Sequence, residues 1–368
     1  MIYLDNAATT KVSQQVLDEV LKCHNVNYGN SSGKHIFGRK VKNYVEQSRK
    51  KVANLINSDQ SEIYFTSGST EGINTALRGF VEANIDKGNH IITTKVEHKA
   101  VLETCNYLES IGIDITYLDV DKNGVIDLQD LENSIKPETI LTSILWVNNE
   151  TGIIQDLESI SGIVKKYNSK LFIDATQAVG KIPVDVKSLK IDLLCLSAHK
   201  FYGPKGIGAL YVAKDITIKP LHYGGSQESS LRAGTTNAPG VLGLGKACEI
   251  AILNDPHVKK TMEYLEKSLL KSFNCEIVGA NSNRSPYITN ILFYGIDADV
   301  VVGKLNKTIV STGSACSSEI NEPSHVLKNM GINDQKAFGA IRFSLSNETM
   351  IKDIDLAILE LEKVIKQY

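Results

Sequence analysis

The sequence has 368 residues, of which 42% are hydrophobic and 22% are charged, and its formal net charge is −2. This near balance of charge gives no electrostatic reason to expect direct binding of nucleic acid or of an anionic membrane. No apolar run approaches the ~18 residues of a membrane-spanning helix, and the first residues lack the pattern of a signal peptide. We therefore expect a cytoplasmic protein with neither a nucleic-acid nor a membrane partner.

Short apolar runs alternate with helical patterns between residues 15 and 256. Apolar residues at three- and four-residue spacing predict helices such as Lys99–Ile111 and Leu157–Asn168. Strands separated by helices favour a mostly parallel sheet that is covered on both faces. The predicted strands are Glu62–Thr66, His90–Thr94, Asp114–Leu118, Leu141–Asn148, Lys170–Asp174, Ile191–Ser197 and Ile207–Val212.

The pattern changes after residue 256. A predicted helix is followed by two strand-like runs and by a final amphipathic helix: His257–Phe273, Ile288–Phe293, Ala340–Leu345 and Ile351–Gln367. We expect an α/β protein with two domains. Residues 15–256 form the large domain, with a mostly parallel seven-stranded sheet between helices, and residues 1–14 and 257–368 form a smaller α+β domain.

The six cysteines and eight histidines are scattered, without a CxxC pair or the spacing of metal ligands. A reducing compartment without structural disulfides and without a metal site is expected. Five of the cysteines fall on helical or strand patterns and are predicted to be small core residues: Cys23, Cys105, Cys195, Cys248 and Cys275. Cys316 differs, because it lies among small residues in STGSACSS, which predicts an exposed loop suited to a nucleophile.

The segment CLSAHKFYGPKGIG places Lys200 directly after a predicted buried strand. Open α/β sheets bind ligands at the carboxyl ends of their strands, so this position suits a lysine that forms a Schiff base with pyridoxal phosphate. A solvated surface lysine is the ordinary alternative. Lys205 competes for the same role, but it lies inside the turn and is expected to point outward.

Polar residues follow several other predicted strands. In LFIDATQAVG, Asp174 either caps a helix or pairs with the pyridine nitrogen of the cofactor, and Gln177 is in reach of its phenolic oxygen. FTSGSTEGIN offers hydroxyl groups and backbone N–H groups to a phosphate, although many helix N-termini look alike. His98 either is structural or stacks on the cofactor ring, and Asn149 follows the strand Leu141–Asn148.

Arg342 lies within the predicted strand AIRFSLS. Ile341, Phe343 and Leu345 share one face of that strand, and Arg342 shares the other with two serines. A buried arginine needs a partner, which is either a structural carboxylate or the carboxylate of a substrate.

Taken together, these segments resemble the cysteine desulfurases. These are pyridoxal phosphate enzymes of the class V aminotransferase group, and the resemblance is to the branch that serves iron–sulfur cluster assembly and nitrogenase. The resemblance runs from end to end of the chain. It is carried by YLDNAATT, TSGSTEGIN, KVEHKAV, VNNETG, DATQAVGK, SAHKFYGPKGIG, STGSACSS and IRFSLS.

The resemblance implies a role for each residue of the site. Lys200, Cys316 and His98 are the implied catalytic residues: Lys200 carries the cofactor, Cys316 accepts sulfur and His98 stacks on the ring. Arg342 and Asn149 bind the substrate, and Asn149 also contacts the cofactor. The further residues implied to contact pyridoxal phosphate are Ser69, Thr70, Asp174, Gln177, Ser197, His199 and, from a second subunit, Thr235.

The implied reaction converts L-cysteine to L-alanine and leaves a persulfide on Cys316. A homodimer is expected, together with a sulfur-acceptor protein, which is either an iron–sulfur scaffold or a thiolation enzyme. The alternatives are a relay or scaffold homologue with impaired chemistry, and a transaminase or β-lyase of a related amino acid. The intact Cys316 favours the desulfurase.

The sequence departs from the family pattern in the segment GGSQESSLRAGT. Ser226, Ser229 and Ser230 replace a glycine, an arginine and another glycine, and Ala233 replaces a serine. Ser31 likewise stands where a proline is common. The departures put the loop conformation at the subunit boundary in question, but they leave Lys200 and Cys316 in place.

Overall fold

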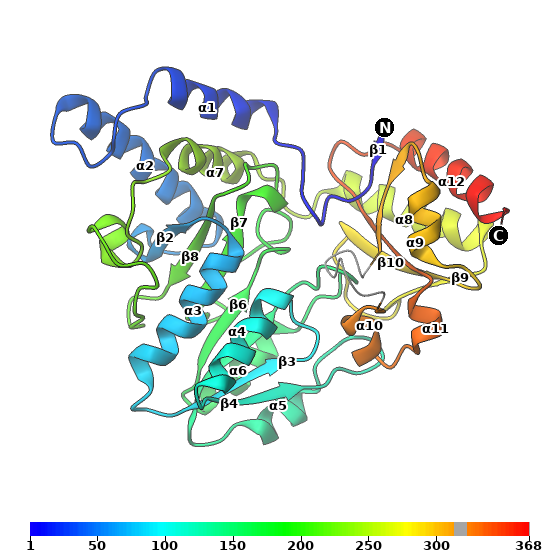
Figure 1. The fold of residues 1–368 in the computed structure, drawn as a ribbon, viewed down its shortest axis with the longest axis horizontal. Coiled ribbons are helices and arrows are strands. Elements are labelled where there is room, and N and C mark those ends of the chain that lie inside the picture. The colour runs from blue at the N-terminus through cyan, green and yellow to red at the C-terminus, as the bar shows by residue number, and fades with distance from the viewer. Residues whose placement is uncertain (313–321, 368) are drawn as a thin grey trace.

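The computed structural model describes residues 1–312 and 322–367. Figure 1 shows two layered parts side by side. Among the described residues, one part contains a seven-stranded sheet and the other a four-stranded sheet. The mostly parallel α/β architecture predicted from the sequence is confirmed. The domain boundaries near residues 15 and 256 stay a prediction.

The seven strands of the larger sheet are arranged in the order β2-β8-β7-β6-β5-β3-β4. Strand β8 is antiparallel to both of its neighbours, and the other pairs are parallel. The carboxyl ends of β5, β6 and β7 therefore meet at one edge of the sheet. The strands are β2 (Ile63–Thr66), β3 (His90–Thr94), β4 (Asp114–Leu118), β5 (Thr139–Leu145), β6 (Lys170–Asp174), β7 (Leu193–Ser197) and β8 (Gly208–Val212).

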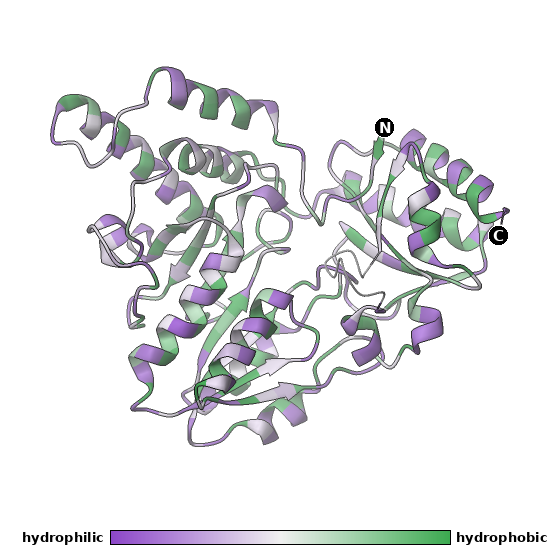
Figure 2. Ribbon diagram, viewed as in Figure 1, coloured by the Kyte–Doolittle hydropathy of each residue, from purple (hydrophilic) through white to green (hydrophobic). Residues whose placement is uncertain are grey.

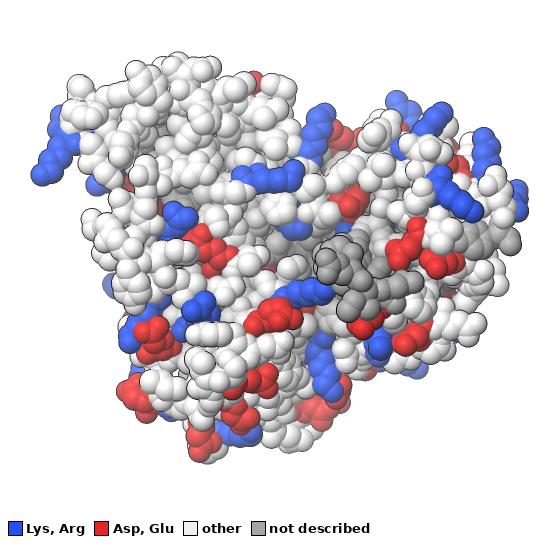
Figure 3. Space-filling view, viewed as in Figure 1, with Lys and Arg blue, Asp and Glu red and all other residues white. Residues whose placement is uncertain are grey.

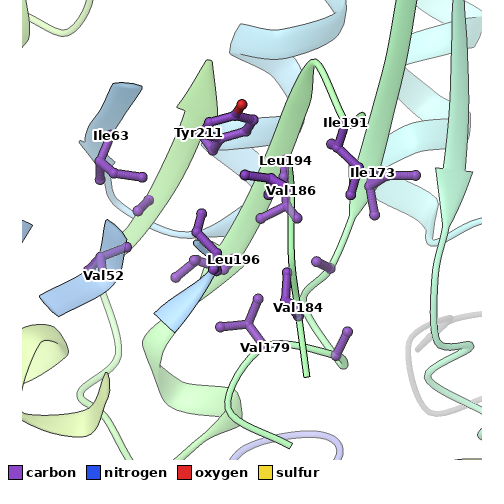
Figure 4. Close-up of a cluster of buried hydrophobic side chains, with 14 of the residues drawn as sticks. Val52, Ile63, Ile173, Val179, Val184, Val186, Ile191, Leu194, Leu196 and Tyr211 are labelled. Atoms are coloured by element: carbon purple, nitrogen blue, oxygen red, sulfur yellow. The ribbon is translucent and has the colours of Figure 1, made fainter. Parts of the chain in front are cut away.

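Helices cover both faces of this sheet, as the continuous apolar strands require. Along β7, Leu193 and Cys195 face the cluster that contains α3 and α4, whereas Leu194 and Leu196 face the opposite cluster. Figure 4 shows Leu194 and Leu196 beside Val184 and Val186 of the connection after β6. The helices are α1 (Gln14–Asn25), α2 (Ile36–Leu55), α3 (Ser69–Asn84), α4 (Lys99–Ser110), α5 (Leu128–Ser134), α6 (Leu157–Lys166) and α7 (Ala238–Ile250), with 3-10 turns η1 (Gln60–Glu62), η2 (Ala198–Lys200) and η3 (Gln227–Ser230).

The smaller part contains an antiparallel sheet with the order β12-β13-β10-β9. Its core packs against α8 and α12, whose hydrophobic residues gather on one face (Figure 2). The strands are β9 (Cys275–Ile277), β10 (Ile288–Phe293), β12 (Ser311–Thr312) and β13 (Ala340–Ser344), and the helices are α8 (Pro256–Ser272), α9 (Ala298–Lys304), α10 (His325–Asn329), α11 (Asp334–Ala337) and α12 (Ile351–Ile365).

The N-terminal segment connects the two parts. Strand β1 (Ile2–Tyr3) pairs with β11 (Thr308–Ile309) in the smaller part. A few residues later, the Thr10 amide donates to the His199 carbonyl of the larger part at 2.8 Å. The chain then enters α1, which packs on α7. Residues 4–10 therefore cross between the two sheets (Figure 1).

Strand β5 ends earlier than the hydrophobic pattern predicts, at Leu145 instead of Asn148. The side chain of Asn148 accepts hydrogen bonds from the amides of Glu150 and Thr151 at 2.9 and 3.0 Å, which closes a turn. Asn149 therefore lies in this turn rather than directly after the strand.

The surface agrees with the near-zero net charge. On the face drawn in Figure 3, basic and acidic side chains are mixed among the described residues. Within residues 1–312 and 322–367, no helix is long and apolar enough to cross a membrane.

Candidate active site

A cavity of about 590 Å³ lies at the carboxyl ends of β5, β6 and β7. The N-terminal segment and strands β12 and β13 complete its wall. Asp5, Ala7, Ala8, Ser69, Thr70, His98, Asn149, Glu150, Asp174, Thr176, Gln177, Ser197, His199, Lys200, Ser311, Thr312 and Arg342 are among its lining residues. The fold thus brings together all of the sequence-predicted site residues except Thr235 and Cys316.

Lys200 extends into this cavity from η2, directly after β7. Its Nζ donates hydrogen bonds to the Ala7 and Ala8 carbonyl oxygens, both at 2.8 Å. The N-terminal segment therefore holds the amine at the cavity wall. Lys205 is exposed, as predicted from its place in the turn, although it also borders the cavity.

Asp174 is the last residue of β6, and only 2% of its surface is exposed. Its Oδ1 accepts hydrogen bonds from the Thr176 amide at 3.0 Å, from the Thr176 hydroxyl and from the Cys195 thiol at 3.5 Å. No described helix begins at Asp174, so the helix-cap alternative is wrong and the side chain closes a turn instead. A carboxylate fixed in this way is suited to pair with a cationic ring nitrogen.

The N-terminus of α3 forms one wall of the cavity. Gly68, at its N-cap, has a φ of 154° and supplies no capping side chain, so the first amides of the helix remain available to a ligand. A Cβ at Gly68 would lie 3.5 Å from the Ser197 hydroxyl. The Ser69 hydroxyl lies 2.6 Å from the Thr176 hydroxyl, whose single proton is donated to Asp174. Backbone amides and hydroxyl groups thus form a cradle of the kind that binds phosphate.

His199 adds a neutral imidazole to this cradle. Burial, followed by the charges of Lys200, Lys205 and Lys181, lowers the pKa of His199 to about 4. Its Nδ1 lies 3.2 Å from the Thr9 hydroxyl. A neutral ring that accepts the Thr9 proton at Nδ1 carries its own proton on Nε2, which can then donate to a phosphate oxygen.

His98 lines the cavity and also caps α4, because its Nδ1 accepts a hydrogen bond from the Ala100 amide at 3.1 Å. Burial is the main cause that lowers the pKa of His98. The imidazole is therefore neutral near pH 7, and the helix cap fixes the direction of its ring. The structural role and a stacking role are compatible at this position.

Gln177 has a buried partner that the sequence interpretation missed. The Nζ of Lys181 donates to Gln177 Oε1 at 2.6 Å, and Gln177 Nε2 donates to the Ala7 carbonyl at 2.8 Å. Burial lowers the pKa of Lys181 to about 7, with smaller contributions from Lys200 and Arg342. The lysine fixes the orientation of the Gln177 amide.

Arg342 is buried on the polar face of β13, as predicted, opposite the apolar face formed by Ile341 and Phe343. Its Nη2 lies 2.7 Å from Asp5 Oδ1, and its Nη1 donates to the Asn149 carbonyl at 3.0 Å. The structure thus supplies the structural carboxylate that the sequence left as an alternative. The Arg342 Nε is buried without a hydrogen-bond partner among the described residues.

Two further buried carboxyl groups lie in this region. Burial raises the pKa of Glu97 to about 8, and its Oε1 accepts hydrogen bonds from the Leu145 amide and the Thr94 hydroxyl. Burial also raises the pKa of Glu150, whose Oε2 accepts a hydrogen bond from the Ser324 hydroxyl. Glu150 lines the cavity, whereas Glu97 is not among its lining residues.

Two of the predicted site residues are not placed in the cavity. Cys316 lies outside the described residues. Thr235 is exposed in the single chain and is not among the residues that line the cavity. The proposed contribution of Thr235 to the site of a second subunit stays a prediction.

Comparison with known proteins identifies the family. The sequence model of the class-V aminotransferases matches residues 2–356. Cysteine desulfurase IscS of Clostridium botulinum is 41% identical over 375 residues, which cover 100% of this chain and 94% of that protein. The chain belongs to the cysteine desulfurases of this family. Cysteine desulfurase IscS of Dictyoglomus turgidum is 43% identical over 373 residues, which cover 100% of this chain and 95% of that protein.

Solved structures of desulfurase relatives have the same fold. A NifS-like protein superposes with a TM-score of 0.94 at 36% identity, covering 100% of both chains. A structure of SspA in complex with cysteine superposes with a TM-score of 0.86 at 36% identity, covering 94% of this chain and 99% of that one.

Pyridoxal phosphate is the cofactor of this family, and the residues of the cavity fit it. The uncapped N-terminus of α3 suits its phosphate, the fixed Asp174 carboxylate suits its protonated nitrogen, and Lys200 suits its aldehyde.

Sequence reasoning missed Asp5, Thr176, Lys181, Glu97 and Glu150. Asp5 lies in YLDNAATT and Lys181 in DATQAVGK, two of the segments that carry the family resemblance. Residue type and spacing alone gave no sign that Asp5 would meet Arg342 or that Lys181 would be buried.

Proposed function

We propose that this desulfurase converts L-cysteine to L-alanine and transfers the sulfur to Cys316. The observation that carries the proposal is the convergence of Lys200, Asp174 and Arg342 on one cavity. An amine, a carboxylate for the ring nitrogen and a guanidinium for the α-carboxylate are the groups that amino-acid chemistry with pyridoxal phosphate needs. The complex of the related SspA with cysteine supports cysteine as the substrate.

The roles of the residues follow from their positions in the cavity. Bound pyridoxal phosphate acts as an electron sink for the bonds at the substrate Cα. Ser69, Thr70, Ser197 and His199 would hold the phosphate, His98 would lie against the ring, and Gln177 would contact the phenolic oxygen. Because Lys200 lies within the cavity and close to backbone carbonyls, its amine is placed to remove and return protons at the substrate.

The sulfur step belongs to Cys316. Its thiolate attacks the substrate sulfur, so that a new S–S bond forms while the Cβ–S bond breaks. The electron pair of the broken bond stays on Cβ, which takes up a proton, and alanine results. Cysteine and one enzyme thiol thus give alanine and one enzyme persulfide, without an external oxidant or reductant.

A homodimer, an acceptor protein and a cytoplasmic location complete the proposal. The acceptor is a protein of iron–sulfur cluster assembly or of thiolation, because a persulfide is useful only if a second protein takes the sulfur. The names of the IscS relatives support a place in sulfur transfer.

Product analysis with L-cysteine tests the proposal. We expect one alanine for each sulfur released in the presence of a thiol reductant. A β-lyase would instead give pyruvate and sulfide, and a transaminase would give a 2-oxo acid that keeps its sulfur. Either of these carbon products in place of alanine would contradict the proposed function.

A further inference from the structure

The guanidinium of Arg342, which is proposed to bind the substrate carboxylate, already forms an ion pair with a carboxylate of this chain. Arg342 Nη2 lies 2.7 Å from Asp5 Oδ1, and both side chains are largely buried, with 8% and 17% of their surfaces exposed. Both residues line the cavity. The side chain of Asp5 therefore competes for the same cation that an amino-acid substrate needs.

The backbone around Asp5 is held tightly to β13, the strand that carries Arg342. Asp5 forms a parallel bridge with Ser344, and the Asn6 side chain donates to the Ser344 carbonyl at 2.9 Å. The Ala7 amide donates to the Ser344 hydroxyl at 2.8 Å. These contacts attach the N-terminal segment to Ser344, which is two residues from Arg342 on the same strand. The Asp5 carboxylate therefore stays near the guanidinium when a ligand enters.

We propose that Asp5 shares Arg342 with the substrate carboxylate and so limits the affinity of the site for α-amino acids. The inference rests on the proposed function, because it takes Arg342 as the carboxylate site. A guanidinium has five N–H donors, so it can bind two carboxylates. The two anions repel each other, and an Arg342 that is already neutralised attracts the second one less strongly.

The proposed role matters most for release of the product. Cysteine and alanine carry the same α-amino and α-carboxylate groups, so a site that holds this carboxylate too tightly would retain alanine after each turnover. Asp5 lowers the affinity for the common part of the two molecules. Discrimination in favour of cysteine is then left to its sulfur atom.

The variant Asp5→Asn separates competition from positioning. Asparagine keeps the side-chain oxygen that accepts the hydrogen bond from Arg342, but it removes the negative charge. If competition operates, the holoenzyme of this variant binds L-alanine about tenfold more tightly than the parent, as measured by isothermal titration calorimetry. Binding of L-alaninamide, which lacks the carboxylate, stays unchanged and serves as the ligand control.

Equal or weaker binding of L-alanine by the Asp5→Asn variant would overturn the inference, provided that its cofactor content and circular dichroism match those of the parent. If this variant does not fold, Asp5→Ser gives a second uncharged side chain with the same expected gain. The charge-retaining variant Asp5→Glu is expected to remain close to the parent in affinity.

The variant Arg342→Met distinguishes failure of the inference from failure of the proposed function. We expect the affinity of this variant for L-alanine to fall by about a hundredfold, because one charge-assisted pair is removed. If Arg342→Met binds L-alanine like the parent, the carboxylate role of Arg342 and the competition by Asp5 both fail. If Arg342→Met loses binding while Asp5→Asn changes nothing, only the inference fails.

Discussion

The amine of Lys200 lies 2.8 Å from the carbonyl oxygen of Ala7, although 193 positions separate the two residues in the sequence. The same carbonyl accepts a hydrogen bond from Gln177. The N-terminal segment therefore forms part of the active site rather than only the edge of the smaller sheet. It binds the residues that would hold the aldehyde and the phenolic oxygen of the cofactor.

Replacing Lys200 with alanine should abolish covalent attachment of the cofactor. Among the residues that the structure describes, no other lysine combines a position directly after β7 with hydrogen bonds to residues 7 and 8. We expect loss of the visible absorption band and a fall in turnover of at least about a thousandfold. Lys205→Ala, five residues after Lys200, is the matched control and should keep both the absorption band and the turnover. Borohydride reduction followed by peptide mapping would contradict the assignment if it located the adduct on Lys205.

The buried Lys181 predicts a specific dependence of stability on pH. Its pKa of about 7 lies below the ordinary value of 10.5, so the unfolded chain binds the proton more readily between these two values. The titration of Lys181 should therefore make the free energy of unfolding rise as the pH increases above 7. Relative to Lys181→Met, the parent protein should gain about 3 kcal/mol between pH 7 and pH 10.

Urea unfolding of both proteins across this pH range measures that difference. The exposed Lys205 supplies the control, because Lys205→Met should show the same pH dependence as the parent. A constant difference between the parent and Lys181→Met from pH 7 to pH 10 would show that Lys181 keeps its ordinary pKa in the folded protein.

The divergent loop GGSQESSLRAGT contains backbone strain. Glu228, Ser229 and Ser230 have positive φ values of 47°, 53° and 68°. This left-handed region is unfavourable for residues other than glycine. Because glycine lacks a Cβ, Ser230→Gly should stabilise the protein by about 0.5–1 kcal/mol. Ser226, with a φ of −84°, is the matched control, since Ser226→Gly should be neutral or destabilising. Calorimetry that placed the two variants in the opposite order would contradict this account.

A homodimer is predicted to complete each site with Thr235 from the second subunit. The residue is exposed in the single chain, so it is free to contact a neighbouring copy. Light scattering should give twice the mass of the chain. Thr235→Ala should weaken cofactor binding by about tenfold through loss of one hydrogen bond to phosphate, and Thr235→Ser should restore it. A monomer that holds the cofactor fully would contradict the prediction.

Much of the larger sheet could be predicted because its strands are continuous apolar runs. The bounds of β3, β4 and β6 agree with the expectation to the residue. Strands β1, β9, β11 and β12 were missed, because runs of two or three residues carry no periodicity. The end of β5 was misplaced because side-chain hydrogen bonds of Asn148, rather than hydropathy, close the following turn.

Site residues that lie at the carboxyl ends of strands could be predicted from the order of the strands in the sheet. Lys200 and Asp174 could be placed at one edge because β6 and β7 are neighbouring parallel strands. The pair of Asp5 and Arg342 could not, since 337 positions separate the two residues. A buried lysine such as Lys181 looks like a surface lysine in the sequence, because its burial depends on packing contributed by distant segments.

The most direct test of the desulfurase account is a single turnover of L-cysteine on the parent protein and on Cys316→Ser. A serine hydroxyl neither ionises near neutral pH nor attacks divalent sulfur well, yet the substitution leaves Lys200 and Arg342 unchanged. The account predicts that the parent releases one alanine and that mass spectrometry finds one added sulfur on Cys316. It also predicts that Cys316→Ser binds cysteine but releases almost no alanine. Undiminished release of alanine by Cys316→Ser, or a parent protein without added sulfur after turnover, would contradict the account.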